Sequence, residues 1–403
     1  MSLPVHGWYR FPAGFSAKWA RSVIDKHRES TDRLALLDPF AGVGTTVLSG
    51  EDAGVKAYGV EAQPFIQKIA AAKLLWHTDT VAFRDAAQAV VGQASGRSPR
   101  RYLYPKLIHG CFGEEALSDL NNLRHTWEEM DDGGPVAKLT WLALVGILRS
   151  CSSAGTAPWQ YVLPSKTKSK VLAPYDAFNL QVRKMLADMT LWQMTDVRCD
   201  ANIFLDDARL LNTIADDSVG LVITSPPYAN NYDYGDATRL EMSFFGEVTG
   251  WGDLHEKARK HLIRSCSQHA SIEKLDLNRL LDELVGTTLV GEISSVCDAL
   301  AEQRLYHGGK KDYHLMVAAY FADMRKAWRS LRRVCASGAR ACFVVGDSAP
   351  YGVYVPTDRW LGELALDAGF RDYSFEKIRD RNVKWKNRKH DVPLKEGFLW
   401  VQG

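Results

Sequence analysis

The sequence Leu34-Ala-Leu-Leu-Asp-Pro-Phe-Ala-Gly-Val-Gly-Thr-Thr46 decides the class of fold. Its first four residues are apolar and predict a short buried strand, and the glycine-containing stretch after them predicts a loop. Residues 47–53 suit a helix that ends at Gly54, and residues 57–60 predict a second strand that runs into Glu61. A strand, a loop, a helix and a further strand in this order indicate an α/β protein with a mainly parallel sheet.

The glycine loop predicts a site for a nucleoside-containing cofactor. Gly42 and Gly44 stand in a sharp turn directly after the strand, and glycine permits both positive φ and a close approach of the backbone to a ligand. Glu61 can accept hydrogen bonds from both hydroxyls of a ribose. A P-loop would need Gly-Lys-Ser/Thr, and a dinucleotide loop would need a third small residue where Val47 stands. The loop therefore favours S-adenosylmethionine, and the alternative is a plain tight turn.

A second motif, Thr224-Ser-Pro-Pro-Tyr228, follows the apolar residues 219–223 and predicts a stiff loop at a strand end. Proline fixes φ and lacks a backbone donor, so the Ser225 hydroxyl oxygen and the Pro226 carbonyl can form two neighbouring acceptors. Two acceptors suit the exocyclic amine of a nucleobase, because they localise its lone pair for in-line attack on a sulfonium methyl group. The candidate catalytic residues are Ser225, Pro226, Pro227 and Tyr228. The alternative is a Pro-Pro turn in which Tyr228 packs.

Composition sets the broader limits. The 403 residues suggest two domains, or one catalytic domain with large insertions. The net charge of +2 neither requires nor excludes a polyanionic partner. The longest apolar stretches are far shorter than the roughly 20 residues of a membrane span, and the first residues lack a signal-peptide core, so we expect a cytoplasmic protein. The seven cysteines and eleven histidines have no metal-ligand spacing, which predicts reduced thiols and no metal.

Together, the glycine loop and Ser-Pro-Pro-Tyr resemble the motifs of the amino-group DNA methyltransferases, and the serine form is similar to their cytosine-N4 branch. The resemblance covers residues 6–75, 200–247 and 313–403. It implies a Rossmann-like fold with a mostly parallel seven-stranded sheet, S-adenosylmethionine as the cofactor and DNA as the substrate. It implies a site-specific enzyme that methylates N4 of a flipped-out cytosine in the bacterial or archaeal cytosol, in association with the nucleoid, beside a restriction endonuclease or a phage-defence system.

Further site residues follow from this resemblance. Residues 10–19 are similar to the segment that lines the methionine end of the cofactor, and Asp206-Asp-Ala-Arg209 is similar to an acidic motif in which Asp207 would meet the adenine amine. The residues expected to bind the cofactor are Phe15, Asp38, Pro39, Phe40, Gly42, Gly44, Thr45, Thr46, Glu61, Asp207 and Ser225.

The order of the motifs predicts how the chain is divided. Residues 1–75, 196–247 and 313–403 are expected to form the catalytic core. Residues 76–195, mostly helical in pattern, form a candidate target-recognition region. Residues 248–312 form a second helical insertion, which departs from the simplest family pattern and could contact DNA.

Contact with DNA requires positive charge opposite the phosphates. The tail at 376–390 is strongly basic, and lysines alternate in a loop at 166–170. The candidate nucleic-acid-binding residues are Lys166, Lys168, Tyr232, Arg381, Lys384, Lys386 and Arg388. The alternative is a solvated charged face for each basic patch, and loop packing for Tyr232.

Three other functions remain open at this stage: adenine-N6 methylation of DNA, methylation of RNA, and a non-catalytic DNA-binding subunit. Cytosine-C5 methylation is disfavoured, because it needs a Pro-Cys nucleophile and none of the seven cysteines follows a proline.

Overall fold

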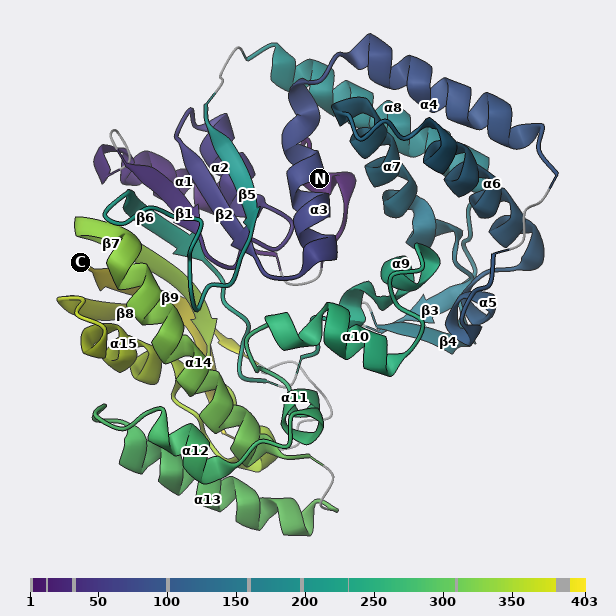
Figure 1. The fold of residues 1–403 in the computed structure, drawn as a ribbon. Helices are drawn as coiled ribbons and strands as arrows, with labels where there is room; N and C mark the ends of the chain where they lie inside the picture. Colours follow the sequence, from purple (N-terminus) through teal and green to yellow (C-terminus); the bar gives the residue numbers. More distant parts are fainter. Residues whose placement is uncertain are drawn as a thin grey trace.

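The computed structural model describes residues 3–11, 14–30, 34–98, 102–157, 161–195, 199–230, 232–308, 311–381 and 392–403. A seven-stranded sheet runs through it in the order β5-β2-β1-β6-β7-β9-β8 (Figure 1). The strands are β1 (Ala35–Asp38), β2 (Ala57–Glu61), β5 (Ala201–Leu205), β6 (Val219–Thr224), β7 (Cys335–Gly346), β8 (Asp372–Arg381) and β9 (Leu394–Gln402). Strand β9 is antiparallel to both neighbours, and the other pairs are parallel. The predicted Rossmann-like fold with a mostly parallel seven-stranded sheet is confirmed.

Two separate apolar cores cover the two faces of the sheet. Leu36 and Ile223 enter one core, while their neighbours Leu37 and Val222 enter the other, because successive side chains of a strand point to opposite faces. Helices α1, α2 and α3 cover the first face, and α14 and α15 cover the second. Their bounds are α1 (Ala17–Lys26), α2 (Thr45–Asp52), α3 (Pro64–Lys73), α14 (Tyr313–Val334) and α15 (Thr357–Asp367).

A helical layer lies between β2 and β5 in the sequence and packs on α3 (Figure 1). It consists of α4 (Thr80–Ser95), α5 (Lys106–Cys111), α6 (Glu114–Met130), α7 (Pro135–Cys151) and α8 (Pro174–Gln193). Helix α7 contacts α3, α4, α6 and α8, which explains why it is apolar on nearly all sides. The sequence predicted helices in this region, but a hairpin of β3 (Ala154–Thr156) and β4 (Val162–Thr167) follows α7.

A second group of helices lies between β6 and β7 in the sequence. It consists of α9 (Arg239–Phe244), α10 (Trp251–Lys257), α11 (Ser267–Ile272), α12 (Leu277–Asp282) and α13 (Val290–Tyr306). Helices α11, α12 and α13 pack on α14, whereas α9 contacts α5 and α7 of the other insertion. Short 3-10 helices occur at His6–Trp8, Arg28–Ser30, Leu74–His77, Asp236–Thr238, Arg259–His261 and Pro350–Gly352.

Helix α14 begins at Tyr313, where Met316 and Val317 extend its buried face. Strand β7 begins at Cys335, where its pairing with β6 starts across an irregular register. No helix in the described ranges is long and apolar enough to cross a membrane.

Candidate active site

The two sequence motifs meet at the centre of the sheet, between the adjacent strands β1 and β6. From β1 the chain adds β2 and β5 on one side, and from β6 it adds β7 on the other. Loops that leave the carboxyl ends of such strands diverge, and open α/β sheets bind ligands in the space between them. A pocket of about 820 Å³, partly open to solvent, lies here. The predicted site residues that line it are Phe15, Pro39, Phe40, Gly42, Thr45, Glu61, Asp207, Ser225 and Pro227.

The glycine loop is tied to the end of strand β2. Gly42 and Gly44 have φ of 52° and 84°, which other residues adopt only with strain. The Gly42 amide donates to Glu61 Oε2 over 2.9 Å, and the Ala41 amide donates to the Val60 carbonyl over 2.9 Å. Gly42 faces the pocket. Gly44 does not, since a Cβ added there would meet Ala70 and Ile203 in the core.

Glu61 presents a carboxylate that the backbone holds in place. Its Oε2 accepts from the Gly42 amide, and its Oε1 accepts from the Gln63 amide over 2.8 Å. Burial raises the pKa of Glu61 to about 7, although these amides oppose the shift. Each oxygen keeps a lone pair, so the carboxylate can still accept two hydroxyl groups from a ligand in the pocket.

Asp38 joins the two motifs and does not line the pocket. Its Oδ1 accepts from the Thr224 hydroxyl over 2.5 Å and from the Phe40 amide over 3.0 Å, and its Oδ2 accepts from the Thr46 hydroxyl over 2.7 Å. Burial raises its pKa to about 6 against these bonds. Asp38 and Thr46 do not line the pocket, and their side chains bond to each other. Asp38 thereby fixes the glycine loop relative to Thr224, the residue before Ser225. Contact of Asp38 and Thr46 with the cofactor stays a prediction.

The two aspartates after β5, Asp206 and Asp207, have different hydrogen-bond partners. Asp206 closes its own turn, since Oδ1 accepts from the Asp207 amide and Oδ2 from the Thr213 amide and hydroxyl, over 2.7 to 2.9 Å. Asp207 lines the pocket, and its carboxylate accepts from the Arg209 guanidinium over 2.6 to 3.0 Å. The sequence did not indicate this ion pair.

Ser225 faces the pocket from the end of β6. Its hydroxyl donates to the Val344 carbonyl of β7 over 3.2 Å. A hydroxyl has a single hydrogen, so the Ser225 oxygen is left as an acceptor for any other partner. Pro226 and Pro227 contribute no N–H to this loop. The loop therefore presents acceptors, which is the polarity that an amine substrate needs.

Tyr228 does not line this pocket and packs beside Arg381 of β8. The guanidinium lies 5.1 Å from the ring centroid, within the range of a cation–π interaction, and it donates to the Asp347 carbonyl over 2.6 Å. Burial raises the pKa of Tyr228 to about 12. Arg381, predicted to contact nucleic acid, thus lies against the second motif.

The other predicted nucleic-acid contacts have mixed outcomes. Lys166 is exposed, but it belongs to strand β4 and not to a loop. Lys168 is partly buried and donates to the Arg149 carbonyl, so its ammonium group already has a partner. Tyr232 is 7% exposed and stacks on Tyr161, an arrangement that fits the alternative of loop packing. Lys384, Lys386 and Arg388 lie outside the described residues.

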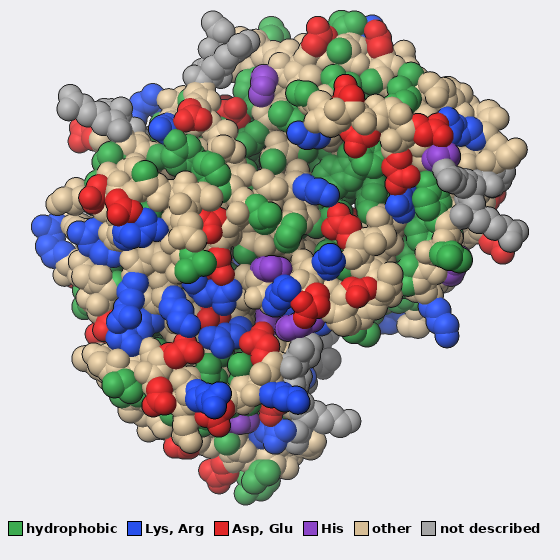
Figure 2. All heavy atoms as spheres, viewed as in Figure 1, with side chains coloured by type: hydrophobic (Ala, Val, Ile, Leu, Met, Phe, Trp, Pro, Cys, Tyr) green, Lys and Arg blue, Asp and Glu red, His purple; other side chains and the backbone are tan. Residues whose placement is uncertain are grey.

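Basic side chains gather around α14 on the face shown in Figure 2, with acidic side chains among them. Lys326 pairs with Glu283 over 2.7 Å, Arg329 with Asp367 over 3.6 Å, and Arg333 pairs with Asp216. This patch is therefore largely neutralised, and its charge alone does not indicate a phosphate-binding surface.

Part of the pocket wall comes from residues outside the two motifs. His261, Leu262 and Ile263, all from the second insertion, line the pocket together with Phe11, Gln63 and Tyr234. The apolar pair Leu262-Ile263 within a run of basic residues was the one local signal. A segment of the insertion that was considered for DNA contact therefore forms part of the pocket wall.

The chain is similar in sequence to curated methyltransferases over nearly its whole length. It is 25% identical to the Type II methyltransferase M.BsoBI of Geobacillus stearothermophilus over 425 aligned residues, covering 94% of this chain and 81% of the relative. It is 26% identical to the Type II methyltransferase M.AvaI, in sequences from Nostoc sp. and from Anabaena variabilis, with 92% and 80% covered. No family model matches the chain.

Among solved structures, the chain is similar to the rRNA methyltransferase aviRa from Streptomyces viridochromogenes. The match covers 98% of this chain and 89% of that one, at 10% identity and a TM-score of 0.30, which is too low to support an argument. The sheet order fits the expected Rossmann-like fold. The similarity to methyltransferases over nearly the whole chain implies S-adenosylmethionine as the methyl donor.

Proposed function

We propose that this chain is a Type II DNA methyltransferase that transfers the methyl group of S-adenosylmethionine to the N4 amine of cytosine. The observation that carries the proposal is the bond from the Ser225 hydroxyl to the Val344 carbonyl, because it uses the one hydroxyl hydrogen and leaves the oxygen of a pocket-lining residue as an acceptor. The same pocket is lined by Glu61 and the glycine loop. The base and the methyl donor would therefore meet at one place.

The residues of the pocket suit the parts of S-adenosylmethionine. Glu61 would accept the ribose hydroxyls, and Phe15, Gly42 and Thr45 would contact the methionine part. Pro39 and Phe40 offer apolar surface, and Asp207, which lines the pocket while it accepts hydrogen bonds from Arg209, would lie beside the adenine amine. When bound, this cofactor supplies a methyl group activated by a sulfonium charge.

Ser225 and the Pro226 carbonyl would accept the two hydrogens of the cytosine amine. This contact localises the nitrogen lone pair, which otherwise delocalises into the ring, and it stabilises the positive charge that develops during transfer. One N–H proton then leaves to solvent, so the product is neutral. Pro227 stiffens the loop, and Tyr228, fixed on one face by Arg381, offers its ring to the base.

We propose the first insertion, residues 76–195, as the target-recognition region, with residues 1–75, 196–247 and 313–403 as the catalytic core. The Tyr161 hydroxyl of the first insertion accepts from the Asp233 amide over 2.7 Å, which links that insertion to the segment after Ser-Pro-Pro-Tyr. Contacts with DNA by Lys166, Arg381, Lys384, Lys386 and Arg388 belong to the same proposal. The Type II class of the relatives suggests a cognate restriction endonuclease as a partner.

The test is to incubate purified protein with S-adenosylmethionine bearing a deuterated methyl group and with duplex DNA, and then to analyse the nucleosides by mass spectrometry. We expect labelled 4-methylcytosine. Labelled 6-methyladenine alone would move the proposal to the adenine branch, and label in structured RNA but not in DNA would make the chain an RNA enzyme. DNA binding without transfer to any nucleic acid would indicate a non-catalytic subunit.

A further inference from the structure

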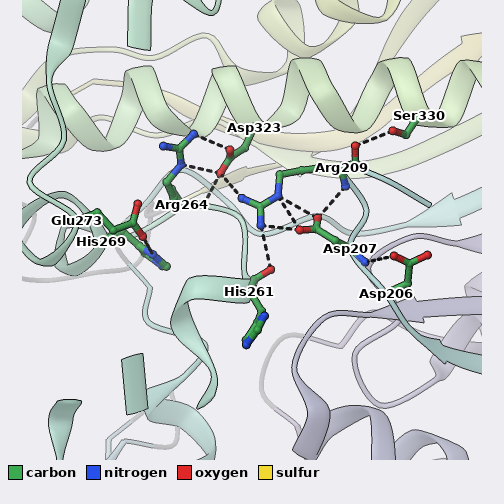
Figure 3. Close-up of polar contacts among 9 residues, drawn as sticks. All are labelled: Asp206, Asp207, Arg209, His261, Arg264, His269, Glu273, Asp323 and Ser330. Carbon is green, nitrogen blue, oxygen red and sulfur yellow. Dashed lines mark hydrogen bonds and ion pairs between the residues drawn. The ribbon is translucent and has the colours of Figure 1, made fainter. Parts of the chain in front are cut away.

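A buried carboxylate on α14 connects two segments that line the pocket. Asp323 is fully buried, and it meets two arginines from different segments (Figure 3). Arg264 donates to both of its oxygens over 2.7 and 2.9 Å, and the Arg264 amide donates to Oδ2 over 3.0 Å. Arg209 approaches Oδ2 from the other side, with a distance of 3.4 Å from Nη1.

Each arginine is bonded or adjacent in sequence to residues that line the pocket. Arg209 holds the Asp207 carboxylate through Nε and Nη2, and its Nη2 also donates to the His261 carbonyl over 3.3 Å. Arg264 follows Ile263 immediately, so its bonds to Asp323 fix the end of the 261–263 segment. Asp207 and residues 261–263 line the pocket from opposite sides of this network.

The two arginines compensate for the burial of the Asp323 carboxylate. Burial alone would raise the pKa of Asp323, but the hydrogen bonds and charges of Arg264, together with the charge of Arg209, outweigh it and lower the pKa. Asp323 is therefore ionised, and its removal would leave two partly buried guanidinium groups without their shared partner. Breaking such a pair costs far more than replacing both members. Helix α14 forms a further bond to this network, in which the Ser330 hydroxyl donates to the Arg209 carbonyl over 2.7 Å.

We infer that Asp323 is a positioning residue for the cofactor: through Arg209 and Arg264 it sets the distance between Asp207 and the 261–263 segment. The inference rests on the proposed function, because it places the nucleoside end of S-adenosylmethionine between these two walls. The second insertion then serves as a wall of the cofactor site, held against the core by ion pairs. Asp323 itself does not line the pocket and acts only through its partners.

A purely structural role would have the same local geometry, so the test needs a matched control on the same helix. Arg325 of α14 forms a comparable ion pair with Asp367 of α15, over 2.9 and 3.3 Å. Arg325 also donates to the carbonyls of Glu283 and Val285 in the second insertion. Neither member of this pair lines the pocket. Asp367→Asn therefore removes the ion pairs that Arg325 and Arg329 of α14 form with Asp367, and it leaves the residues Asp207 and 261–263 themselves unchanged.

The experiment measures binding of S-adenosylhomocysteine by calorimetry, together with KM for S-adenosylmethionine and kcat, for wild type, Asp323→Asn and Asp367→Asn. We expect Asp323→Asn to weaken binding and raise KM by roughly tenfold or more, the scale on which residues behind a ligand site act, while kcat at saturating cofactor stays close to wild type. Asp367→Asn should lower the melting temperature and leave the dissociation constant unchanged. If Asp323→Asn does not fold, Arg264→Lys keeps the charge, loses the two-point contact and should weaken binding in the same direction.

Three results would contradict the inference. Equal affinity in wild type and Asp323→Asn, or in Arg264→Lys where that variant replaces it, would refute the positioning role alone. Equal weakening in Asp323→Asn and Asp367→Asn would show a general loosening of α14. Absence of S-adenosylhomocysteine binding in the folded wild type would overturn the proposed function and this inference with it.

Discussion

The two walls of the pocket are built by different means. The wall formed by the loops after β1, β2 and β6 is held by hydrogen bonds of the buried Asp38 and the half-buried Glu61 to backbone amides and to hydroxyls. A second wall, residues 261–263, is held by arginines that meet Asp323 from distant segments. The first wall depends on hydrogen bonds to single amide and hydroxyl groups, and the second depends on ion pairs.

This difference predicts how each wall responds to change. Short bonds to backbone groups fix individual atoms, so a substitution in the first wall should act on catalysis or on one contact with the cofactor. Ion pairs between distant segments set the spacing of whole elements, so a substitution in the second wall should act on affinity.

The largest effect is expected at Ser225, where the first wall meets the substrate amine. Ser225→Ala removes the acceptor and should lower kcat by roughly 10²- to 10³-fold, the range for loss of one group that stabilises a transition state, while S-adenosylhomocysteine binding stays near wild type. The measurement is single-turnover methyl transfer beside calorimetry. Ser218→Ala is the control, because Ser218 precedes the same strand at its other end and its hydroxyl donates to the nearby Ala215 carbonyl. A variant Ser225→Ala that loses cofactor affinity and keeps its kcat would reverse the assignment.

The next effect concerns Glu61. Glu61→Gln replaces one acceptor oxygen by a donor that faces a backbone N–H, and we expect the dissociation constant of S-adenosylhomocysteine to rise by roughly 10- to 100-fold at pH 8, as for loss of a hydrogen bond to a charged group. Glu51→Gln provides a match, since Glu51 is also buried, accepts from the Trp76 indole over 2.8 Å and has its pKa raised to about 7 by burial, but lies outside the pocket. Similar binding by the two variants would exclude Glu61 from the ribose contact.

A pH dependence follows from the same carboxylate. In the free protein the pKa of Glu61 is raised by burial to about 7, so the group is largely protonated at pH 6 and largely ionised at pH 8. The ionised form accepts hydroxyl groups better, so binding of S-adenosylhomocysteine should release a proton and strengthen by about tenfold from pH 6 to pH 8. Calorimetry in buffers of different ionisation enthalpy measures the released proton. An affinity that falls with rising pH, or an unchanged slope in Glu61→Gln, would argue against this coupling.

The smallest effect is expected on the exposed hairpin of the first insertion. If Lys166 contacts a phosphate, Lys166→Gln should weaken DNA binding a few-fold and reduce the slope of log Kd against log salt concentration by about one. Lys138→Gln, an exposed lysine on α7 of the same insertion, serves as the reference for a change of charge alone. Identical slopes in the two variants would remove Lys166 from the DNA surface and leave the first insertion without a tested contact.

The sequence predicted those site residues whose roles follow from their type and from their place in a short motif. Gly42, Glu61 and Ser225 stand at strand ends, and their residue types already imply a close backbone approach, a ribose acceptor and an amine acceptor. The fold class followed from the same stretches, because alternating strands and helices leave few other arrangements. Asp38 was recognised as part of the motif, but its three partners could not be inferred, since Thr224 lies far away in the sequence.

The remaining features depend on contacts between distant segments. No spacing links Asp323 to Arg209 and Arg264, and charged residues are common enough that such a triad has no sequence signature. The β3–β4 hairpin lies in a region whose sequence pattern indicates helices. Tyr232 was predicted to contact nucleic acid, because its stacking on Tyr161 could not be inferred from the sequence. Lys168 looked free for the same reason, because its partner is a backbone carbonyl of α7.

The most direct test of the central claim is a crystal structure of the protein with S-adenosylhomocysteine and a cytosine-containing DNA. The account predicts the ribose hydroxyls on Glu61, the sulfur atom facing the Ser225 hydroxyl, and the amine of a flipped cytosine between Ser225 and the Pro226 carbonyl. A ligand bound elsewhere, or a Ser225 hydroxyl that donates to the base instead of accepting from it, would contradict the account.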